Sequence, residues 1–327
     1  MSKYLLVLTV FAFSLLGAVE NSITPVIDYF ECIENLQQEK YNEAQFKKIE
    51  NGLCKKCKKI RVMTYNMLFD LFDHNLAPVN RWPARLPRIV ALINEMNPDV
   101  IGTQELQPNQ VQDLVPLLAP TYTFFSVNSS TGDQDGIFIK KKRFHIHKKE
   151  LVFSESDPET PVITIVELKD KKTAATVAIA NSHFSFSNVE NRGLEAHLVA
   201  KKVHCLSKHI PVIFMGDLNT FPNRPDNSFP FYDGDYVNDI LTKNTLQDSI
   251  DVSLVGHVGP ISTFTNNPPS ILPFEGTGTP GVFLDHMYVS NGITVLIHAV
   301  QPGTVDGHFP SDHMPVVIDC VVERCRS

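Results

Sequence analysis

Strong polar side chains interrupt the apolar strands of this sequence where those strands are expected to end. Asn66 closes the run VMTYN, Glu105 closes DVIGTQE and His183 closes AIANSH. Asp217 and Asn219 follow the run VIFMG. Loops at strand ends are where a rigid scaffold usually presents catalytic groups, and a buried carboxylate needs a partner. We therefore expect these side chains to meet one another, a metal ion, or both.

Further groups of the same kind lie near the C-terminus, where Asp285 begins DHMYV and Asp312-His313 precedes MPVVI. Carboxylate and amide oxygens suit Mg²⁺, Mn²⁺ or Ca²⁺, and no clustered Cys/His set favours zinc. Such an ion neutralises phosphate charge and lowers the pKa of a bound water. The His–Asp pair and the second histidine suit proton transfer and stabilisation of negative charge. The combination predicts metal-assisted phosphoester chemistry.

Each of these residues has a simpler interpretation when it is taken singly. Asn66 and Asn219 fit ordinary turns, and Glu105 fits a solvent-facing position. His183 fits a hydrogen-bonded structural residue, and Asp312-His313 fits a cap or a surface loop. The ordered combination is what favours catalysis.

The apolar runs that position these groups predict an α/β protein with buried sheets. Expected helices lie at 85–96, 108–118 and 189–208. Expected strands lie at 60–68, 98–106, 121–127, 135–140, 161–168, 174–182, 211–219, 282–289, 293–300 and 315–322. A Pro/Gly/Asn-rich loop region is expected at 259–281.

The composition is that of an ordinary globular protein. The 327 residues include 29 Lys and Arg against 36 Asp and Glu, and 43% of residues are hydrophobic. These values exclude collagen-like, low-complexity and broadly disordered chains. The net charge of −7 argues against nucleic-acid binding by bulk electrostatics, but it leaves open an enzyme that meets phosphate through a metal ion.

The first twenty residues predict a secretory signal peptide, because one early lysine precedes an uncharged apolar run. This implies a secreted or periplasmic protein, with an uncleaved anchor or a buried N-terminal helix as alternatives. Residues 21–57 form an expected helical, cysteine-bearing extension, and residues 58–327 form the expected catalytic domain. The cysteines at 32, 54, 57, 205, 320 and 325 favour structural bridges near the two termini over a redox or metal role.

Six motifs in this order resemble the endonuclease/exonuclease/phosphatase superfamily, which includes deoxyribonuclease I, deadenylases, neutral sphingomyelinases and inositol polyphosphate 5-phosphatases. The motifs are TYNML, GTQE, NSHF, GDLNTFP, LDHMYVS and SDHMPVV. The resemblance covers roughly residues 58–323. It implies a four-layered α/β sandwich of two mixed β-sheets flanked by helices.

The resemblance also implies roles for individual residues near the metal ion. Glu105 would be the principal metal ligand, and Asn66 would bind the metal or place the phosphate. Asp312 would lie next to the metal and assist it or a bound water. Mg²⁺ or Mn²⁺ is the expected ion, and Ca²⁺ is an alternative.

The remaining roles concern water and phosphate. Asp217 would orient or deprotonate the attacking water, and Asn219 would hold the phosphate. His183 takes the place of a phosphate-contacting residue. His313 would pair with Asp285 as a general acid/base or an electrostatic stabiliser.

The substrate is less defined than the reaction. The stretch RWPARLPRIVALINEMNPDVIGTQELQPNQ resembles deadenylase-like members. In that subgroup an arginine at the place of Arg192 could face substrate phosphate, and a solvated helix position is the alternative. A nuclease is the favoured interpretation, and its groove would need cations. The candidates are Arg81, Arg85, Arg88 and Lys140–Arg143.

Two alternatives stay open. A phosphatase or phospholipase C-like enzyme on phosphorylated lipid or inositol head groups would use an apolar rim. Its candidates are Phe184, Phe186, Phe221, Phe229 and Phe231, with the loop PPSILPF at 268–274 nearest to a membrane-entering segment. A catalytically silent binding or toxin subunit would show loss of a metal ligand or of the His–Asp pair, and the full set is present here. No obligate protein partner is indicated.

Overall fold

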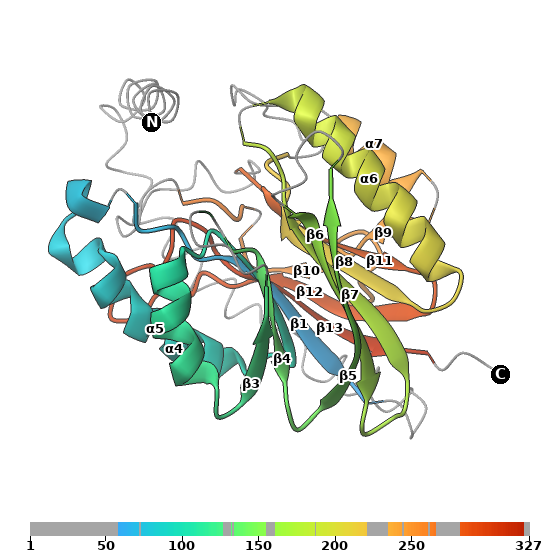
Figure 1. Ribbon diagram of the computed structural model, residues 1–327, viewed down its shortest axis with the longest axis horizontal. Helices are drawn as coiled ribbons and strands as arrows, with labels where there is room; N and C mark the ends of the chain where they lie inside the picture. The colour runs from blue at the N-terminus through green and yellow to red at the C-terminus, as the bar shows by residue number, and fades with distance from the viewer. Residues whose placement is uncertain are drawn as a thin grey trace.

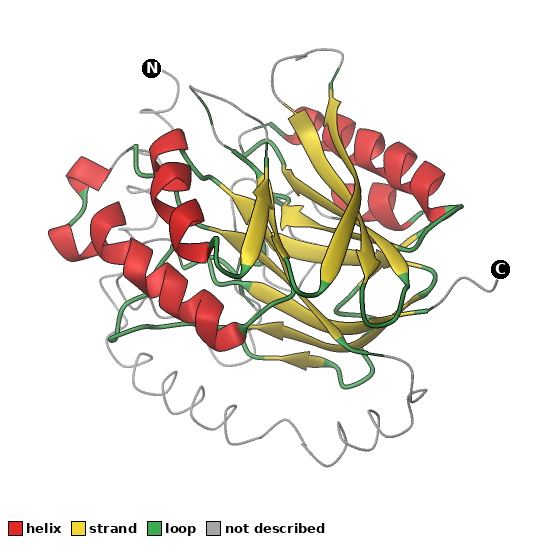
Figure 2. Ribbon diagram, turned by 60° about the horizontal axis from the view of Figure 1, so that its bottom comes forward, coloured by secondary structure: helices red, strands yellow, loops and turns green. Residues whose placement is uncertain are grey.

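The protein is described by a computed structural model over residues 58–71, 73–126, 132, 134–154, 161–186, 188–220, 235–243, 245–260, 262–265 and 282–323. The expected signal peptide at 1–20 and the extension at 21–57 lie outside these residues. Two β-sheets pack face to face, and a pair of helices covers the outer face of each (Figures 1 and 2). The predicted four-layered α/β sandwich is confirmed.

The first sheet has seven strands in the order β10-β12-β13-β1-β2-β4-β3. Its strands are β1 (Ile60–Asn66), β2 (Val100–Gln104), β3 (Tyr122–Phe125), β4 (Gly136–Lys140), β10 (His257–Val258), β12 (Ile293–Val300) and β13 (Val316–Val322). The central strand β1 runs parallel to β2 and antiparallel to β13. Because both faces of the sheet are covered, β1 reads as a nearly continuous buried run rather than an alternating one.

The second sheet has six strands in the order β5-β6-β7-β8-β11-β9. They are β5 (Phe144–Phe153), β6 (Pro161–Asp170), β7 (Thr176–His183), β8 (Val212–Asp217), β9 (Leu246–Asp248) and β11 (Asp285–Ser290). The pair β7 and β8 is parallel, whereas β11 pairs antiparallel with β8. Both sheets are therefore mixed.

The helices fall into two pairs, one on each outer face. Against the first sheet lie α4 (Trp82–Met96) and α5 (Pro108–Leu118), preceded by the short 3₁₀ helices η2 (Asp73–Asn75) and η3 (Pro78–Asn80). Against the second sheet lie α6 (Val189–Ser207) and α7 (Tyr236–Thr242). The ends of α4 and α6 follow local sequence. Asn97 takes a left-handed conformation after α4, and the side chain of Asn188 accepts a hydrogen bond from the Asn191 amide. Among the described helices, none is long and apolar enough to cross a membrane.

The main core fills the space between the two sheets. Val62, Val100 and Ile318 of the first sheet pack in one cluster with Ile179 and Met215 of the second, and all five side chains are fully buried. Separate clusters lie beneath each helix pair. Burial of this much apolar surface is the main force that holds the four layers together.

Most expected elements are present, and the differences have a physical cause. The sequence does not predict β5, because FHIHKKELVF carries polar residues on both faces and β5 lies at the edge of its sheet. It also misses the short elements α7, β9 and β10, whose few residues carry little periodicity. Cys205 and Cys320 have free thiols, and the other four cysteines lie outside the described residues, so the expected bridges near the termini stay a prediction.

Gly216 of β8 pairs with Ser182 of β7, one position before the site residue Asp217. A Cβ atom built at Gly216 would lie 1.9 Å from the backbone oxygen of Ser182. Backbone atoms cannot move aside as a flexible side chain can, so only glycine fits this position.

We expect Gly216→Ala to lower the free energy of unfolding by about 2–4 kcal/mol, because the added methyl group overpacks the ladder. Urea titration followed by circular dichroism measures this loss. The control is Gly307→Ala, where a Cβ meets nothing within 4 Å although φ is +74°. The control should lose about 1 kcal/mol from the left-handed conformation alone. Equal losses in both variants would contradict the close approach at Gly216.

Candidate active site

The register of the second sheet places three expected site residues in one row. Asp217, the last residue of β8, pairs with His183 of β7 on one side and with Asp285 of β11 on the other. Strand pairing therefore brings together groups that are up to 102 positions apart in the sequence (positions 183 and 285). The row lies at the end of the sheet where β7 and β8 finish.

Asn66 joins this row to the first sheet. Its Nδ2 donates to Glu105 Oε1 and to Asp217 Oδ2, both at 2.9 Å. Asn66 ends β1, and Glu105 directly follows β2, which runs parallel to β1. Since the ends of parallel strands meet at the same edge, one amide reaches carboxylates from both sheets. The Phe69 amide donates to the other oxygen of Glu105, Oε2, at 3.2 Å.

The predicted His–Asp pair is formed. His313 Nδ1 lies 2.7 Å from Asp285 Oδ2, and His313 Nε2 points to Asp217 Oδ2 at 3.7 Å. The ring of Phe264 packs edge-on against His313, with centroids 5.1 Å apart. Thr263 Oγ1 accepts from the Asp285 backbone amide at 3.1 Å. Because Asp285 is an acceptor, Nδ1 carries the proton and leaves Nε2 directed into the site.

His183 and Asn219 complete the cluster. His183 Nε2 lies 3.5 Å from Asp217 Oδ2 and 4.0 Å from Glu105 Oε1. Asn219 Nδ2 lies 3.1 Å from the same nitrogen of His183 and donates to the Phe184 carbonyl at 2.9 Å. Asp217 Oδ1 accepts from the Asn219 backbone amide at 3.0 Å, so this carboxylate is held on both of its oxygens.

The backbone at this edge adopts conformations that are rare for residues other than glycine. Leu68, Glu105 and Asn219 have φ values of 56°, 62° and 48°. Each follows a strand that ends in the site. Such conformations cost free energy and persist only where surrounding contacts enforce them, and they often occur at functional sites.

The cluster is rich in buried negative charge. Burial raises the pKa of Glu105 to about 7, and Asp312 adds to this rise while His183 opposes it. Burial likewise raises the pKa values of Asp285 and Asp312. Burial alone would lower the pKa of His313, but Asp285 and Asp217 raise it well above its usual range. At neutral pH the neighbouring cationic groups therefore do not fully offset the cost of burying these carboxylates.

A divalent cation fits this donor set. Ligand atoms of Glu105, His183 and Asp217 lie within 4.8 Å of one another, and so do those of Asp217, Asp285 and His313. Carboxylate oxygens with a histidine suit a hard or borderline divalent ion, which would also relieve the repulsion among the acids. Asn66 Oδ1 accepts from the Leu68 amide at 3.0 Å, which fixes the side chain so that its Nδ2 orients Glu105. The metal-ligand roles of Asn66 and Asp312 stay predictions.

Residues 63–313 match the family described as the Endonuclease/Exonuclease/phosphatase family. The matched segment spans well over half of the 327 residues and includes all nine expected site residues. The chain belongs to this family. Members of the endonuclease/exonuclease/phosphatase family are phosphoester hydrolases, many of them metal-dependent. The resemblance carried by the six motifs is confirmed.

Two solved structures and one curated relative illustrate the similarity. The family protein from Bacteroides vulgatus has a TM-score of 0.69 at 22% identity, covering 81% of this chain and 100% of that one. The mannosyl-6-phosphatase of Bacteroides thetaiotaomicron has a TM-score of 0.65 at 24% identity, covering 80% and 99%. At these identities the likeness concerns the fold.

The curated relative is Carbon catabolite repressor protein 4 homolog 3 of Arabidopsis thaliana. It is 27% identical over 189 residues, which cover 51% of this chain and 41% of the relative. The chain therefore spans less than half of the length of this relative.

Arg192 does not lie where the sequence suggested. Its side chain is fully buried beneath the loop that follows His183, and Nη1 donates to the carbonyls of Ser185 and Phe186 at 3.1 and 3.0 Å. This placement supports a role in ordering the loop rather than direct contact with substrate. Phe184 is also buried, in the core under α6, and does not form an apolar rim. Phe221, Phe229, Phe231 and residues 268–274 lie outside the described residues.

Among the cations expected in a substrate groove, Arg85 and Lys140–Arg143 do not face the catalytic cluster. Arg85 is fully buried, and Lys140–Arg143 lies at the opposite end of the sandwich, because β4 runs antiparallel to β2. Arg81 and Arg88 donate to nearby backbone carbonyls, those of Leu76 and Val79. The expectation of a basic groove is therefore not met by Arg85 and Lys140–Arg143, since burial and strand direction decide which end a cation reaches, and it stays a prediction for Arg81 and Arg88.

Arg85 has a structural function that the sequence did not reveal. Its guanidinium donates to the carbonyls of Met67 (2.7 Å), Leu68 (3.0 Å) and Pro310 (3.2 Å). It thereby ties the loop after Asn66 to the loop before Asp312. Ser311 strengthens the same junction, because its hydroxyl donates to the Asn66 carbonyl at 2.7 Å. The sequence feature that could have indicated this role is the position of Arg85 on the apolar face of an amphipathic helix.

Arg85→Met should lower the free energy of unfolding by about 3 kcal/mol, because three loop carbonyls lose their donor inside the protein. Urea titration measures the loss. The matched control is Arg88→Met on the same helix, whose single bond to the Val79 carbonyl is exposed, and it should change stability by less than about 0.5 kcal/mol. A wild-type unfolding midpoint for Arg85→Met would contradict this role.

Glu195 of α6 is a second residue that the sequence did not reveal. Its Oε2 accepts from the Ser185 amide at 2.8 Å, in the loop that Arg192 also supports. Burial raises the pKa of Glu195 to about 7, although the Ser185 bond and His183 oppose the rise. The folded state therefore holds a proton at pH values where the unfolded chain has lost it.

Because the pKa of Glu195 is higher in the folded state, this group favours folding fully at pH values below its pKa in the unfolded chain. The contribution is lost as the pH rises through about 7. Glu195→Gln keeps an acceptor for Ser185 but does not titrate. As the pH rises from 4.5 to 8, the free energy of unfolding of the variant should increase by roughly 2–3 kcal/mol relative to that of wild type. Urea titrations in EDTA across this range measure the gain. Glu190→Gln, at an exposed position of α6, should show no such trend, and parallel curves for all three proteins would refute the assignment.

Proposed function

We propose that this protein is a divalent-metal-dependent hydrolase that directs water onto the phosphorus of a phosphodiester. The observation that carries the proposal is the position of Asp217 Oδ2. It accepts from Asn66 Nδ2 at 2.9 Å and faces His183 Nε2 at 3.5 Å and His313 Nε2 at 3.7 Å. A carboxylate oxygen shared by three polar groups at a strand end is suited to hold and deprotonate a water molecule.

The chain's own residues supply the other steps. His313, held by Asp285, presents a protonated Nε2 that stabilises negative charge developing on the phosphoryl oxygens. Asn219 Nδ2, which lies 3.1 Å from His183 Nε2, would donate to the phosphate once that histidine nitrogen is turned to the metal ion. A bound divalent ion would neutralise the phosphate and lower the pKa of water, with Glu105, His183 and Asp217 as the residues to hold it. We propose Mg²⁺, with Mn²⁺ as the alternative.

We propose nucleic acid as the source of the phosphodiester. The deadenylase-like stretch around α4 supports this substrate, as does the 27% identity to Carbon catabolite repressor protein 4 homolog 3. Base specificity would come from groups outside the cluster, since phosphate contacts position a strand without reading its sequence. The apolar N-terminal run supports export, and we propose a secreted or periplasmic location.

A second candidate is a phosphomonoesterase acting on a small phosphorylated molecule. It is favoured by the placement of Arg85 and Lys140–Arg143 away from the cluster, because a small substrate needs no extended basic track. The fold shared with the mannosyl-6-phosphatase of Bacteroides thetaiotaomicron supports the same interpretation. The two candidates differ in the ester cleaved and share one catalytic cluster.

Glu105→Gln should lower kcat/KM by at least about 100-fold, because an uncharged amide binds a divalent ion weakly while filling the same volume. The panel is single-stranded RNA, plasmid DNA, sphingomyelin, phosphoinositides and mannose 6-phosphate, each with Mg²⁺, Mn²⁺ or EDTA. Cleavage of nucleic acid that EDTA abolishes would support the nuclease. Release of inorganic phosphate alone would favour the second candidate.

The matched control is Glu95→Gln, an exposed position at the far end of α4, which should retain wild-type turnover. Turnover that persists in EDTA, or in Glu105→Gln, would refute the metal-dependent mechanism. A folded, metal-binding protein without activity on any of these esters would instead support a binding subunit.

A further inference from the structure

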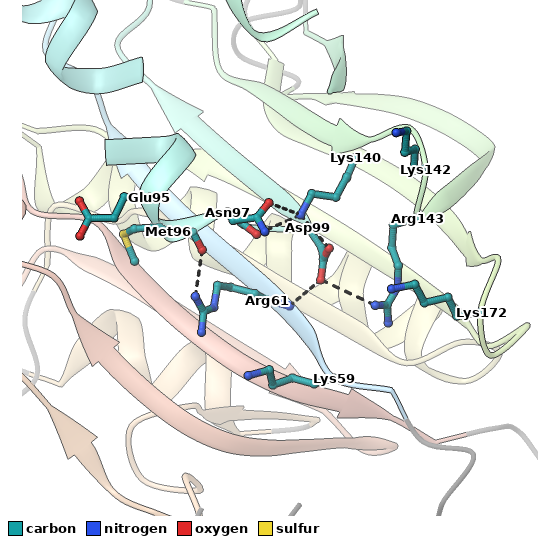
Figure 3. A pocket seen from close by; sticks show the side chains of 10 residues that line it. All are labelled: Lys59, Arg61, Glu95, Met96, Asn97, Asp99, Lys140, Lys142, Arg143 and Lys172. Atoms are coloured by element: carbon teal, nitrogen blue, oxygen red, sulfur yellow. Dashed lines mark hydrogen bonds and ion pairs between the residues drawn. The ribbon is translucent and has the colours of Figure 1, made fainter. Parts of the chain in front are cut away.

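A polar pocket lies at the end of the sandwich opposite the catalytic cluster (Figure 3). It is formed where β1 and β2 begin and where β4 ends, and this open pocket has a volume of about 460 Å³. The seven residues of β1 separate it from Asn66, which corresponds to about 20 Å. Six cationic side chains line it: Lys59, Arg61, Lys140, Lys142, Arg143 and Lys172.

Ion pairs with the buried acids Asp170 and Asp319 hold three of the cations that line this pocket. Arg143 is 5% exposed and binds Asp170 through two bonds, Nε to Oδ1 at 3.0 Å and Nη2 to Oδ2 at 2.9 Å. Arg61 binds Asp319 in the same two-pronged way, at 2.7 and 2.9 Å. Lys59 Nζ lies 2.9 Å from Asp319 Oδ2. These buried carboxylates hold the cations in place and cannot meet a ligand themselves.

One wall would otherwise repel an anion, because the carbonyl end of α4 points here. Two cations neutralise it. Arg61 Nη1 donates to the Met96 carbonyl at 2.9 Å, and Lys140 Nζ donates to the Asn97 carbonyl at 3.0 Å and lies 3.1 Å from Asp99 Oδ1. Figure 3 shows these side chains converging on the pocket from α4, β1 and β4.

Lys142 and Lys172 stand at the exposed rim on two neighbouring turns. The turns are joined by a bond from the Lys171 amide to the Arg143 carbonyl at 2.9 Å. Among the residues that the structure describes, neither Lys142 nor Lys172 has an ion-pair partner. Six cations thus stand against four carboxylates, Glu95, Asp99, Asp170 and Asp319, in a protein whose net charge is −7.

We propose that this pocket is a binding site for a small multiply charged phosphate compound, of the pyrophosphate or nucleoside-polyphosphate class. Its volume falls within the range of small-molecule sites, roughly 300–1,000 Å³. Charge-assisted bonds from two free ammonium groups above a fixed guanidinium favour adjacent phosphates over a single monovalent anion. The site is separate from the catalytic cluster, so occupancy does not require hydrolysis.

Isothermal titration calorimetry with inorganic pyrophosphate, on the full chain in EDTA at moderate salt, tests the proposal without metal-dependent chemistry. We expect saturable binding by wild type and about tenfold weaker binding by Lys142→Gln/Lys172→Gln, which removes the two rim charges. The matched control, Lys201→Gln/Lys208→Gln, removes two exposed charges on and just after α6 and should bind as wild type does. Hydrolytic turnover with metal should be unchanged in both variants.

Three results would overturn the proposal. They are no saturable pyrophosphate binding by wild type, equal weakening in both double variants, and binding of a single-stranded oligonucleotide without binding of pyrophosphate. The last result would assign the surface to a nucleic-acid strand. An ATP arm identifies the ligand class, since tighter binding than pyrophosphate indicates a nucleotide and equal binding indicates the phosphates alone.

Discussion

The whole site depends on one constraint, the confinement of several buried carboxylates to a single edge of two packed sheets. Like charges in a low-dielectric interior repel strongly, so Glu105 and Asp217 can lie close only if donors and cations stand between them. The Asn66 amide is the donor that both share, and it reaches one acid from each sheet. His183 and His313 offset part of the negative charge of these acids. The negative charge that is left makes a divalent cation a suitable ligand for the cluster.

The loops around the cluster follow from that constraint. The acids and histidines keep their places only if the loops after β1 and before β13 stay at a fixed distance. These loops meet at Asn66 and Ser311, which are 245 positions apart in the sequence. Arg85 and Ser311 tie them together through backbone carbonyls, so the ties do not depend on further side chains. Arg192 and Glu195 hold the loop after His183 in a similar way. Each of the three loops is therefore fixed by a polar side chain that is buried beneath or beside it.

The same strands carry opposite charge at their two ends. Acids collect where β1 and β2 finish, and cations collect where these strands begin. Antiparallel β4 returns its Lys140 end to the beginning of β2, which adds to the basic end instead of the catalytic one. This chain thus has one end whose acids suit a metal ion and another end lined by cations, with an apolar core between them.

The motifs along the sequence predicted the sandwich through their family resemblance, and they predicted most residues of the catalytic cluster, Arg192 excepted. Polar groups that interrupt buried apolar runs are a strong local signal, and Glu105, Asp217 and His313 each ended or preceded such a run. The positions of the cations follow from the three-dimensional packing instead. Arg85, Arg192 and Lys140 look alike in sequence, yet two are buried under loops and one lies at the far end. Strand direction and helix packing decide where such a side chain lies, and both are set by contacts between distant segments. A local pattern of residues does not predict these contacts.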